Sequence, residues 1–507
     1  IFFPLCLLIF LLSLLAASYV CDAYKILLIF PLPSKSHLIL AKGMVRHLLK
    51  AGHEVTLLTP YVDKNPPPKL HQVDVSSIDK LSKAGISTIN PMLLPIMTRI
   101  VSVKIIEDEN VQDFLNDKSQ HFDLVIAEWL YNELFASFAA IYNAPLIWFS
   151  SSEPETMMLS IVDEYLNPSY NTMSVTDNPP FTFMQRFSQL LILCDVMSFL
   201  QTRDYNRLAV PHIEARGRVA PAFSDLKYNA SLVLGMSHVS MGAAVRLPQI
   251  YKHIGGYHID DEVEPLPEDL KKIMDNATDG VIYFSMGSSL QSKDWPETLK
   301  REFVQMFGTL KQTVLWKFEE NLPDMPKNLH ILQWAPQQSI LAHPNCLIFI
   351  THGGILSTTE TLHTGKPIIG VPAFGDQFSN VVNAVSKGFA IKVDLSYTMV
   401  KELKAAIEEM LSNPIYAQKA KELSFVFHDR PVKPGDELVH WAEHVIKTHG
   451  APHLRSPALL VPWYQKYYLD LAVLIIFIVI LLRKVLQRLL PLILPKRFGK
   501  NQKIKTN

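Results

Sequence analysis

The sequence has few cysteines and no surplus charge of either sign. Four cysteines occur among 507 residues and no two form a C-x-x-C pair, which excludes the common zinc and thioredoxin-like motifs. Lys plus Arg and Asp plus Glu number 48 each, and this zero formal net charge argues against a nucleic-acid partner. Cys194 and Cys346 could form a disulfide or remain two buried thiols, and the sequence does not decide between them.

A dinucleotide-binding fingerprint is also missing, although strands and helices alternate along a chain long enough for more than one domain. Strands are predicted at residues 24–30 and 53–58, joined by a loop at 31–37 and a helix at 38–51. No G-x-G-x-x-G motif follows the first strand, which disfavours a Rossmann dehydrogenase. In such βαβ units ligands bind at the carboxyl ends of the strands.

Two polar residues are predicted at this edge of the first sheet. His37 ends the loop after the first strand, and Glu128 ends another predicted strand at 121–128. An imidazole suits a general base because its pKa lies near the working pH. A lone histidine in a loop is more commonly structural or solvated, and Glu128 could instead be an acid at a helix N-terminus.

A second set of strands and turns begins at residue 280, with predicted strands at 280–285, 314–318 and 329–332. Glycine lets a ligand approach the backbone closely, serine can donate to a phosphate, and an indole face can stack on a base. Each signal is weak alone, and a tryptophan in such a turn is as often a core residue. The candidate binding residues here are Gly287, Ser288, Lys317, Trp334, Ala335 and Gln337.

The most specific pattern runs from residue 349 to residue 377. A short apolar strand at 347–350 is followed by Thr351-His352-Gly353-Gly354 and then by a predicted helix that carries Ser357 and Glu360. Free backbone N–H groups and the helix dipole make such a turn an anion site. His352 could donate to a phosphate, and Glu360 could accept two hydrogen bonds from a ribose diol. A Gly-Gly turn alone would fit any α/β domain.

The whole pattern resembles the signature of the UDP-glycosyltransferases, and most closely their membrane-bound, insect-like animal branch. The match runs through Thr351 to Gly354, Glu360, Pro367, Pro372 and Asp376-Gln377, while Ala373 stands where a larger apolar residue is usual. The resemblance implies an α/β fold with two tandem Rossmann-like domains of GT-B type that face a cleft. The N-terminal acceptor domain would span 24–255 and the C-terminal UDP-sugar domain 256–450.

The same resemblance assigns roles to the candidate residues. His37 would be the catalytic base and Glu128 its carboxylate partner, in a position where mammalian relatives usually carry Asp. Gly287 and Ser288 would face the diphosphate, Trp334 would stack on uracil with Ala335 and Gln337 beside it, and Asp376 and Gln377 would bind the sugar hydroxyls. The remaining UDP-sugar residues would be Lys317, His352, Gly353, Gly354, Ser357 and Glu360.

The expected reaction is inverting transfer of a hexose from a UDP-sugar to the hydroxyl of a small lipophilic acceptor, as in detoxification. Neither a metal nor a cofactor is expected, because no Asp-x-Asp triplet is present to hold a metal-bound diphosphate. The insect-like resemblance favours glucose, and glucuronate remains an alternative donor sugar. A UDP-sugar-binding membrane protein without turnover and a structural membrane glycoprotein also remain open, as does a homo-oligomeric state.

Both ends of the chain predict the secretory route. Residues 1–23 read as a signal peptide or, alternatively, a permanent anchor, and the absence of an initiator Met suggests that a few residues precede them. A linker at 451–465, a spanning helix at 466–482 and a basic cytosolic tail at 483–507 predict a single-pass protein of the endoplasmic reticulum membrane with lumenal catalytic domains. Asn229 and Asn276 are predicted glycosylation sites.

Overall fold

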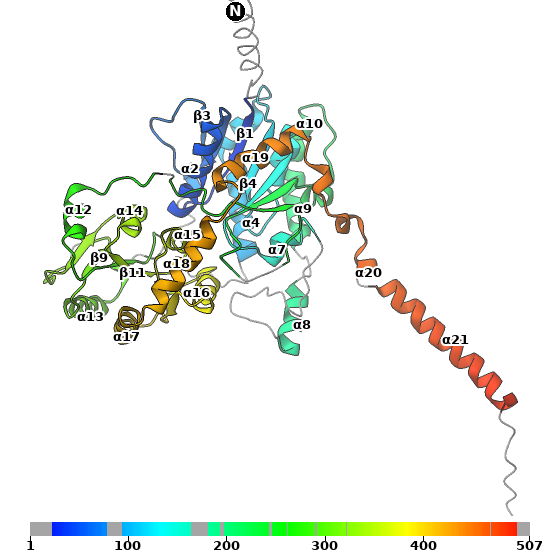
Figure 1. The fold of residues 1–507 in the computed structure, drawn as a ribbon. Helices are drawn as coiled ribbons and strands as arrows, with labels where there is room; N and C mark the ends of the chain where they lie inside the picture. Colours follow the sequence, from blue (N-terminus) through cyan, green and yellow to red (C-terminus); the bar gives the residue numbers. More distant parts are fainter. Residues whose placement is uncertain are drawn as a thin grey trace, which may run out of the picture. The chain divides into compact units, whose positions relative to one another are not determined.

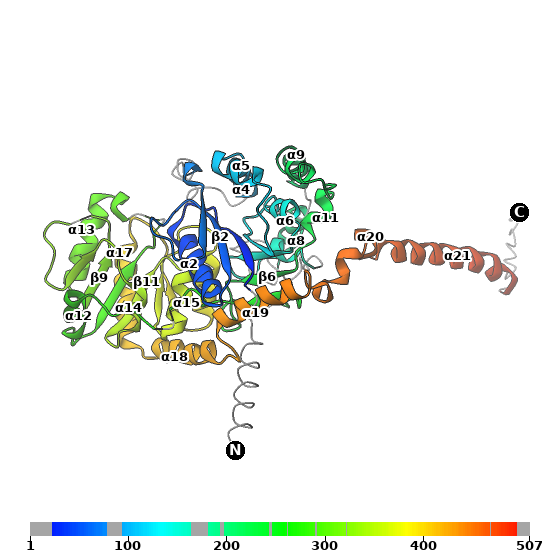
Figure 2. The ribbon, with the colours of Figure 1, turned by 90° about the horizontal axis from the view of Figure 1, so that it is seen from above.

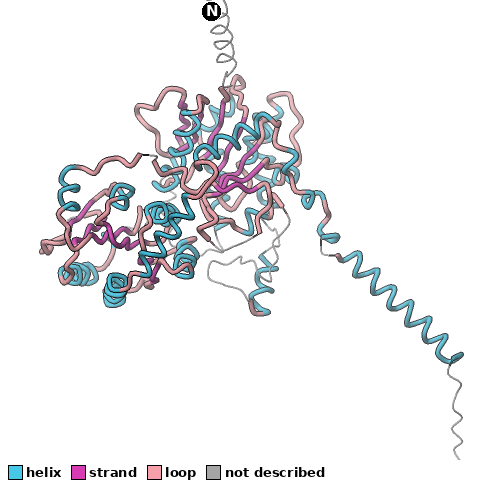
Figure 3. The backbone as a smooth tube through the Cα atoms, viewed as in Figure 1, coloured by secondary structure: helices cyan, strands magenta, loops and turns pink. Residues whose placement is uncertain are grey.

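The computed structural model describes residues 23–78, 94–163, 181–192, 197–242, 246–260, 262–288, 290, 292–320, 322–466 and 468–493. The chain divides into two units, one up to Arg455 and one from Ser456 onward. The first unit contains two parallel β-sheets, each with helices around it (Figure 1; Figure 3, strands in magenta). The predicted signal peptide, Cys194 and the end of the basic tail lie outside the described residues.

The first domain is built on a seven-stranded sheet in which every neighbouring pair is parallel. Its strand order is β3-β2-β1-β4-β5-β6-β7, and the strands are β1 (Lys25–Ile29), β2 (Glu54–Thr59), β3 (Leu70–Asp74), β4 (Leu124–Glu128), β5 (Leu146–Ser150), β6 (Leu232–Gly235) and β7 (Tyr251–His253). The helices are α2 (Lys35–Lys50), α4 (Leu94–Ile106), α5 (Glu109–Asn116), α6 (Ala136–Tyr142), α7 (Thr156–Leu159), α8 (Phe183–Ile192), α9 (Met197–Leu208), α10 (Val210–Glu214) and α11 (Phe223–Lys227).

The second domain is built on a six-stranded parallel sheet of order β10-β9-β8-β11-β12-β13. Its strands are β8 (Val281–Ser285), β9 (Thr313–Lys317), β10 (Leu329–Leu332), β11 (Cys346–Thr351), β12 (Ile368–Gly370) and β13 (Ala390–Lys392). The helices are α12 (Glu268–Asp275), α13 (Glu297–Gly308), α14 (Gln337–Ala342), α15 (Ile355–Thr364), α16 (Gln377–Ser386), α17 (Met399–Ser412) and α18 (Ile415–His428).

The central strands form because their sequences are continuous apolar runs, which parallel strands covered on both faces require. All five residues of β4 and of β8 are buried. In each sheet the strand order reverses beside the first strand, between β1 and β4 and between β8 and β11. Such a reversal opens a crevice at the carboxyl ends of the two strands, so the topology locates one ligand-binding edge in each domain.

The last helix of this unit, α19 (Pro434–Lys447), returns to the first domain and packs against α2 (Figure 2). His53 Nε2 lies 3.4 Å from Glu443 Oε1 on this helix. A Cβ atom at Gly435 would meet the His47 ring, so glycine allows the two helices to approach closely. The segment assigned to the second domain at 256–450 thus ends in a helix that covers the first domain.

The structure corrects the predicted start of the first helix and leaves the predicted membrane span unconfirmed. Helix α2 begins at Lys35, with Ser34 as its N-cap residue, so the predicted loop at 31–37 is too long and His37 lies in the first helical turn. In the second unit, α20 (Trp463–Lys466) begins inside the predicted linker at 451–465, and α21 (Leu469–Ile493) extends beyond residue 482, where the predicted span ends. Among the described residues, no helix combines the length and the apolar character that crossing a membrane requires, and the predicted span at 466–482 is not confirmed.

Candidate active site

The crevice between β1 and β4 holds a histidine–carboxylate pair. His37 comes from the first turn of α2, Glu128 is the last residue of β4, and His37 Nδ1 lies 2.5 Å from Glu128 Oε1. A carboxylate can only accept, so Nδ1 carries the hydrogen and Nε2 keeps a lone pair that can take a proton. Glu128 therefore orients the His37 ring, and it is not the acid at a helix N-terminus that the sequence also allowed, because α6 begins only at Ala136.

The electrostatic environment raises the pKa of His37. Burial opposes protonation of the ring, but the Glu128 carboxylate and its hydrogen bond, together with Asp376, outweigh that effect. Glu128 itself is completely buried, and within the described part of the chain its Oε2 atom has no hydrogen-bond partner. The His37 ring is thus placed to accept a proton, and the Glu128 carboxylate stabilises the positive charge that the ring then carries.

Asp376 brings the second domain into the same site. It precedes α16, and Asn380 Nδ2 donates to its Oδ2 over 2.8 Å. Burial raises the pKa of Asp376, against the lowering effects of Asn380 and His37. The neighbouring Gln377 uses its side-chain oxygen to accept from the backbone N–H groups of Ala373 and Phe374, so its amide N–H groups are what it can offer a sugar hydroxyl.

The crevice between β8 and β11 holds the predicted phosphate-binding groups. Gly287 and Gly353 have φ values of 79° and 80°, which only glycine adopts without strain. A Cβ at Gly287 or at Gly354 would lie 2.6 Å from a His352 ring atom, so both glycines make room for that ring. Burial, reinforced by Lys317, lowers the pKa of His352 to about 4, and this histidine can donate one N–H as a neutral ring.

Lys317 forms a hydrogen bond to the turn that carries Gly287. Its Nζ donates to the Gly287 carbonyl over 3.1 Å and pairs with Glu319 Oε1 at 2.5 Å. Lys317, which the sequence predicts to bind the donor, hydrogen-bonds the turn that carries Gly287 and the half-buried Ser288.

A hydrogen-bonded cluster occupies the predicted nucleoside end. Gln337 Nε2 donates to Glu360 Oε2 over 2.6 Å and to Ser357 Oγ over 3.1 Å. Tyr283 in turn donates its hydroxyl to Gln337 Oε1 over 3.2 Å. Ser357 and Glu360 both belong to α15, whose N-cap is Gly354, so the predicted ribose carboxylate lies on the helix that begins at the anion site.

Trp334 precedes the buried Ala335 in the turn before α14, the helix that carries Gln337. The Trp334 side chain is 56% exposed, and Lys35 Nζ lies 4.2 Å from its ring centroid. This cation–π contact joins the turn before α14 to the helix that carries His37. Sequence reasoning missed Lys35, because nothing local indicates a partner some 300 positions away.

Comparison with known proteins identifies the family. A model of the family described as UDP-glucoronosyl and UDP-glucosyl transferase matches residues 76–503. The chain belongs to this family. The UDP-glucosyltransferase 2 of Dactylopius coccus is 32% identical over 462 residues, which cover 88% of each chain. The UDP-glucuronosyltransferase 2B13 of Oryctolagus cuniculus is 33% identical over 308 residues, which cover 60% of this chain and 57% of its own.

Solved structures agree with this assignment at the level of the fold. The spinosyn forosaminyltransferase SpnP aligns with a TM-score of 0.58 at 15% identity, over 84% of this chain and 100% of its own. The glycosyltransferase VinC, solved in complex with DTDP, aligns with a TM-score of 0.53 at 16% identity, over 83% of this chain and 100% of its own. The UDP-glycosyltransferase described here is therefore an enzyme with two Rossmann-like domains of the GT-B arrangement.

Two further acids of the UDP-glycosyltransferase were not found from the sequence. Glu153 and Glu155 follow β5, and burial raises their pKa values to about 8 and about 7 respectively. Glu155 accepts from the Tyr131 hydroxyl over 2.7 Å and from Ser152 Oγ over 2.8 Å. Asp376 contributes to raising both pKa values, so these acids lie near the predicted sugar end of the donor site.

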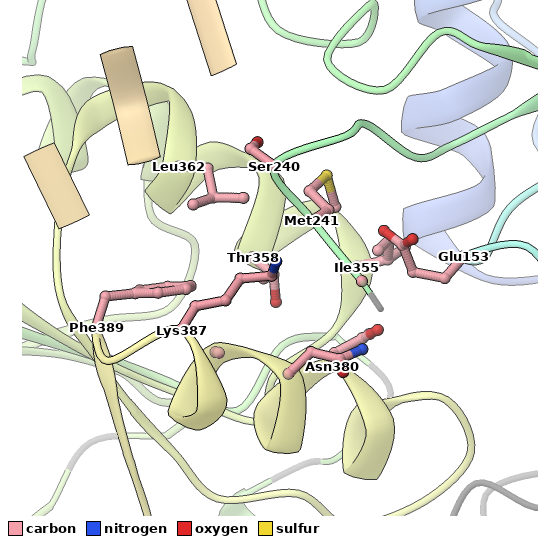
Figure 4. A pocket seen from close by; sticks show the side chains of 12 residues that line it. Glu153, Ser240, Met241, Ile355, Thr358, Leu362, Asn380, Lys387 and Phe389 are labelled. Carbon is pink, nitrogen blue, oxygen red and sulfur yellow. The ribbon is translucent and has the colours of Figure 1, made fainter. Parts of the chain in front are cut away.

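Glu153 also lines a small cavity where the two domains of the UDP-glycosyltransferase meet (Figure 4). The cavity measures about 10 Å³, which is barely enough for one water molecule. Met241 and Glu153 come from the first domain, while Ile355 and Asn380 belong to α15 and α16. Residues of both domains therefore line the space next to Glu153.

Three remaining expectations concern the surface and the cysteines. The predicted glycosylation sites Asn229 and Asn276 are both exposed. Cys346 is a free, buried thiol, and burial raises its pKa to about 12. Its suggested partner Cys194 lies outside the described residues.

Proposed function

We propose that the protein transfers a hexose, with inversion, from a UDP-sugar to the hydroxyl of a small lipophilic acceptor. The observation that supports this most directly is the 2.5 Å contact between His37 Nδ1 and Glu128 Oε1. It leaves His37 Nε2 as a base whose tautomer is fixed by a buried carboxylate. General bases act by this arrangement, in which the carboxylate also stabilises the imidazolium that forms.

The chemistry then follows from the placement of the two crevices. The acceptor hydroxyl gives its proton to His37 Nε2 while its oxygen attacks the anomeric carbon from the face opposite UDP. The bond from that carbon to the UDP oxygen breaks, so an α-linked donor gives a β-glycoside. UDP leaves as an anion stabilised by a His352 N–H and by the free N–H groups at the start of α15. No step in this proposal needs a metal.

The charge near the sugar end favours a neutral hexose, and we take glucose as the donor sugar. Asp376 lies close enough to affect His37, Glu153 and Glu155 electrostatically. The carboxylate of glucuronate would lie beside the Asp376 carboxylate, and two like charges at that distance disfavour each other. Glucuronate remains the alternative because relatives of both kinds match the chain.

The proposed location is the endoplasmic reticulum, with the catalytic unit in the lumen and the C-terminal unit at the membrane. Exposed acceptor sites at Asn229 and Asn276 are compatible with glycosylation there. The apolar run of residues 471–482, which α21 contains, supports the membrane association. The acceptor would bind beside His37, and an oligomeric state remains open.

The test uses microsomes from cells that express the protein. UDP-glucose and UDP-glucuronate are offered separately with a panel of phenols, and UDP release is followed. Transfer from UDP-glucose that disappears in His37→Ala and persists in His71→Ala, a control at an exposed histidine, supports the proposal. UDP binding without transfer from either donor would favour the alternative of a non-catalytic UDP-sugar-binding protein.

A further inference from the structure

A short segment between the two sheets, residues 257–260, binds the helix that carries His37. Tyr257 donates its hydroxyl to the Leu40 carbonyl over 3.1 Å. Arg46 donates to the carbonyls of Tyr257 and Ile259 over 3.0 and 3.1 Å. A Cβ at Gly43 would lie 2.9 Å from the His258 Cα, so the segment is pressed against α2. We call residues 257–260 the interdomain segment.

The same interdomain segment reaches the predicted ribose site from its other side. The Asp260 N–H donates to Gln338 Oε1 over 3.2 Å, and Gln338 lies on α14. His258 Nε2 lies 3.7 Å from Glu360 Oε1, which is within ion-pair range but longer than a hydrogen bond. The interdomain segment therefore connects α2, with the catalytic histidine, to Glu360 on α15.

His258 is an unusual residue in this setting. Its side chain is completely buried, and neither ring nitrogen has a hydrogen-bond partner among the residues that the structure describes. A buried polar group without a partner is costly, and such groups call for an explanation. One acceptor, Glu360 Oε1, is less than 1 Å beyond hydrogen-bonding distance of Nε2.

We propose that His258 is a positioning residue for the donor ribose, an inference that rests on the proposed function. When the two ribose hydroxyls bind Glu360, His258 donates its Nε2 hydrogen to Glu360 Oε1. A carboxylate has about four lone-pair sites. Gln337 already fills one at Oε2, and Gln338 Nε2 donates to Oε1 over a long 3.4 Å. The ribose hydroxyls displace this Gln338 hydrogen bond, so His258 and the two hydroxyls fill the remaining three sites. The imidazole thereby fixes the carboxylate plane in the orientation that accepts both hydroxyls.

The test compares two amides that differ in reach. In His258→Gln the amide nitrogen takes the place of Nε2, whereas in His258→Asn it takes the place of Nδ1 and falls short of Glu360. Calorimetry measures the dissociation constants of UDP and of 2′,3′-dideoxy-UDP, which lacks both hydroxyls. Because a hydrogen bond to a charged group is involved, the preference for UDP should fall roughly tenfold in His258→Asn and stay within roughly threefold in His258→Gln.

His53→Asn is the matched control, since His53 is also fully buried and its Nε2 also lies within ion-pair range of a carboxylate without a hydrogen bond, but that carboxylate is Glu443 on α19. Its preference for UDP should equal that of the wild type. A His258→Asn protein that weakens both nucleotides equally, or neither, overturns the inference. If His258→Asn does not fold, a folded His258→Gln protein that has lost the preference overturns it too. Wild-type protein that binds no UDP would instead overturn the proposed function.

Discussion

At the scale of single residues, the active site depends on the reach of one side chain. The family resemblance implies Asp at the position of Glu128, and a side chain one methylene longer could have missed the imidazole. The structure shows that it reaches His37, because α2 begins at Lys35 and so holds the histidine in its first turn. The helix start at Lys35 and the length of the Glu128 side chain thus together place the two groups within hydrogen-bonding distance.

Replacing Glu128 by Gln tests this pair. The neutral amide no longer raises the pKa of His37, so the acid limb of the profile of kcat/KM against pH should move to lower pH. The amide N–H group can also face Nδ1 and favour the wrong tautomer, so kcat should fall roughly 10²- to 10⁴-fold. Glu443→Gln, which changes the partner of His53, serves as the control. An acid limb that stays in place in Glu128→Gln would contradict the assignment of His37 as the base.

At the scale of secondary-structure elements, the sequence predicts what is local and continuous. The runs at β1, β4 and β8 are apolar throughout and buried, so their position was predictable. The short strands β12 and β13 were missed, because three residues carry too little pattern.

The candidate site was predictable to the same extent. Motif residues that follow strands, such as His37 and His352, were found because strand ends meet at one edge of a sheet. Lys35, His258 and the role of Lys317 were not, since they act through contacts between segments far apart in the sequence. The hydrogen bond from Lys317 to the Gly287 carbonyl and the burial of His258 form only when the domains fold.

The turn after β8 provides a prediction at this scale. Gly287→Ala combines an unfavourable φ of 79° with a Cβ that would lie 2.6 Å from the His352 ring, so that ring must move. In Gly287→Ala, kcat should fall by more than the loss of folding stability alone would explain. The control is Gly52→Ala, where φ is 94° but a Cβ would meet nothing within 4 Å, and it should lower stability by about 1–2 kcal/mol without affecting kcat. Thermal unfolding and UDP release measure the two effects, and equal losses of kcat in both variants would refute the steric argument.

At the scale of the whole catalytic unit, the two domains meet beside Glu153, an acid that burial keeps protonated. Glu153 from the first domain lies beside Ile355 of α15 at the small cavity (Figure 4). Burial raises its pKa to about 8, with Asp376 adding to this effect and Lys387 opposing it. Holding the proton avoids placing an uncompensated charge in the contact between the domains.

Stability of the catalytic unit should consequently depend on pH through Glu153. Between its ordinary pKa of 4.5 and its raised pKa of about 8, the folded protein keeps a proton that the unfolded chain has lost. Stability therefore decreases as pH rises through this window, by up to roughly 1.4 kcal/mol per pH unit. Gln cannot ionise, so the Tm of Glu153→Gln should exceed that of the wild type by a margin that grows from pH 5 to pH 8. Glu268→Gln, at a side chain that is 94% exposed, should show no such growth. Parallel curves of Tm against pH for wild type and Glu153→Gln would mean that Glu153 is ionised in the folded protein and that the contact between the domains opens to water.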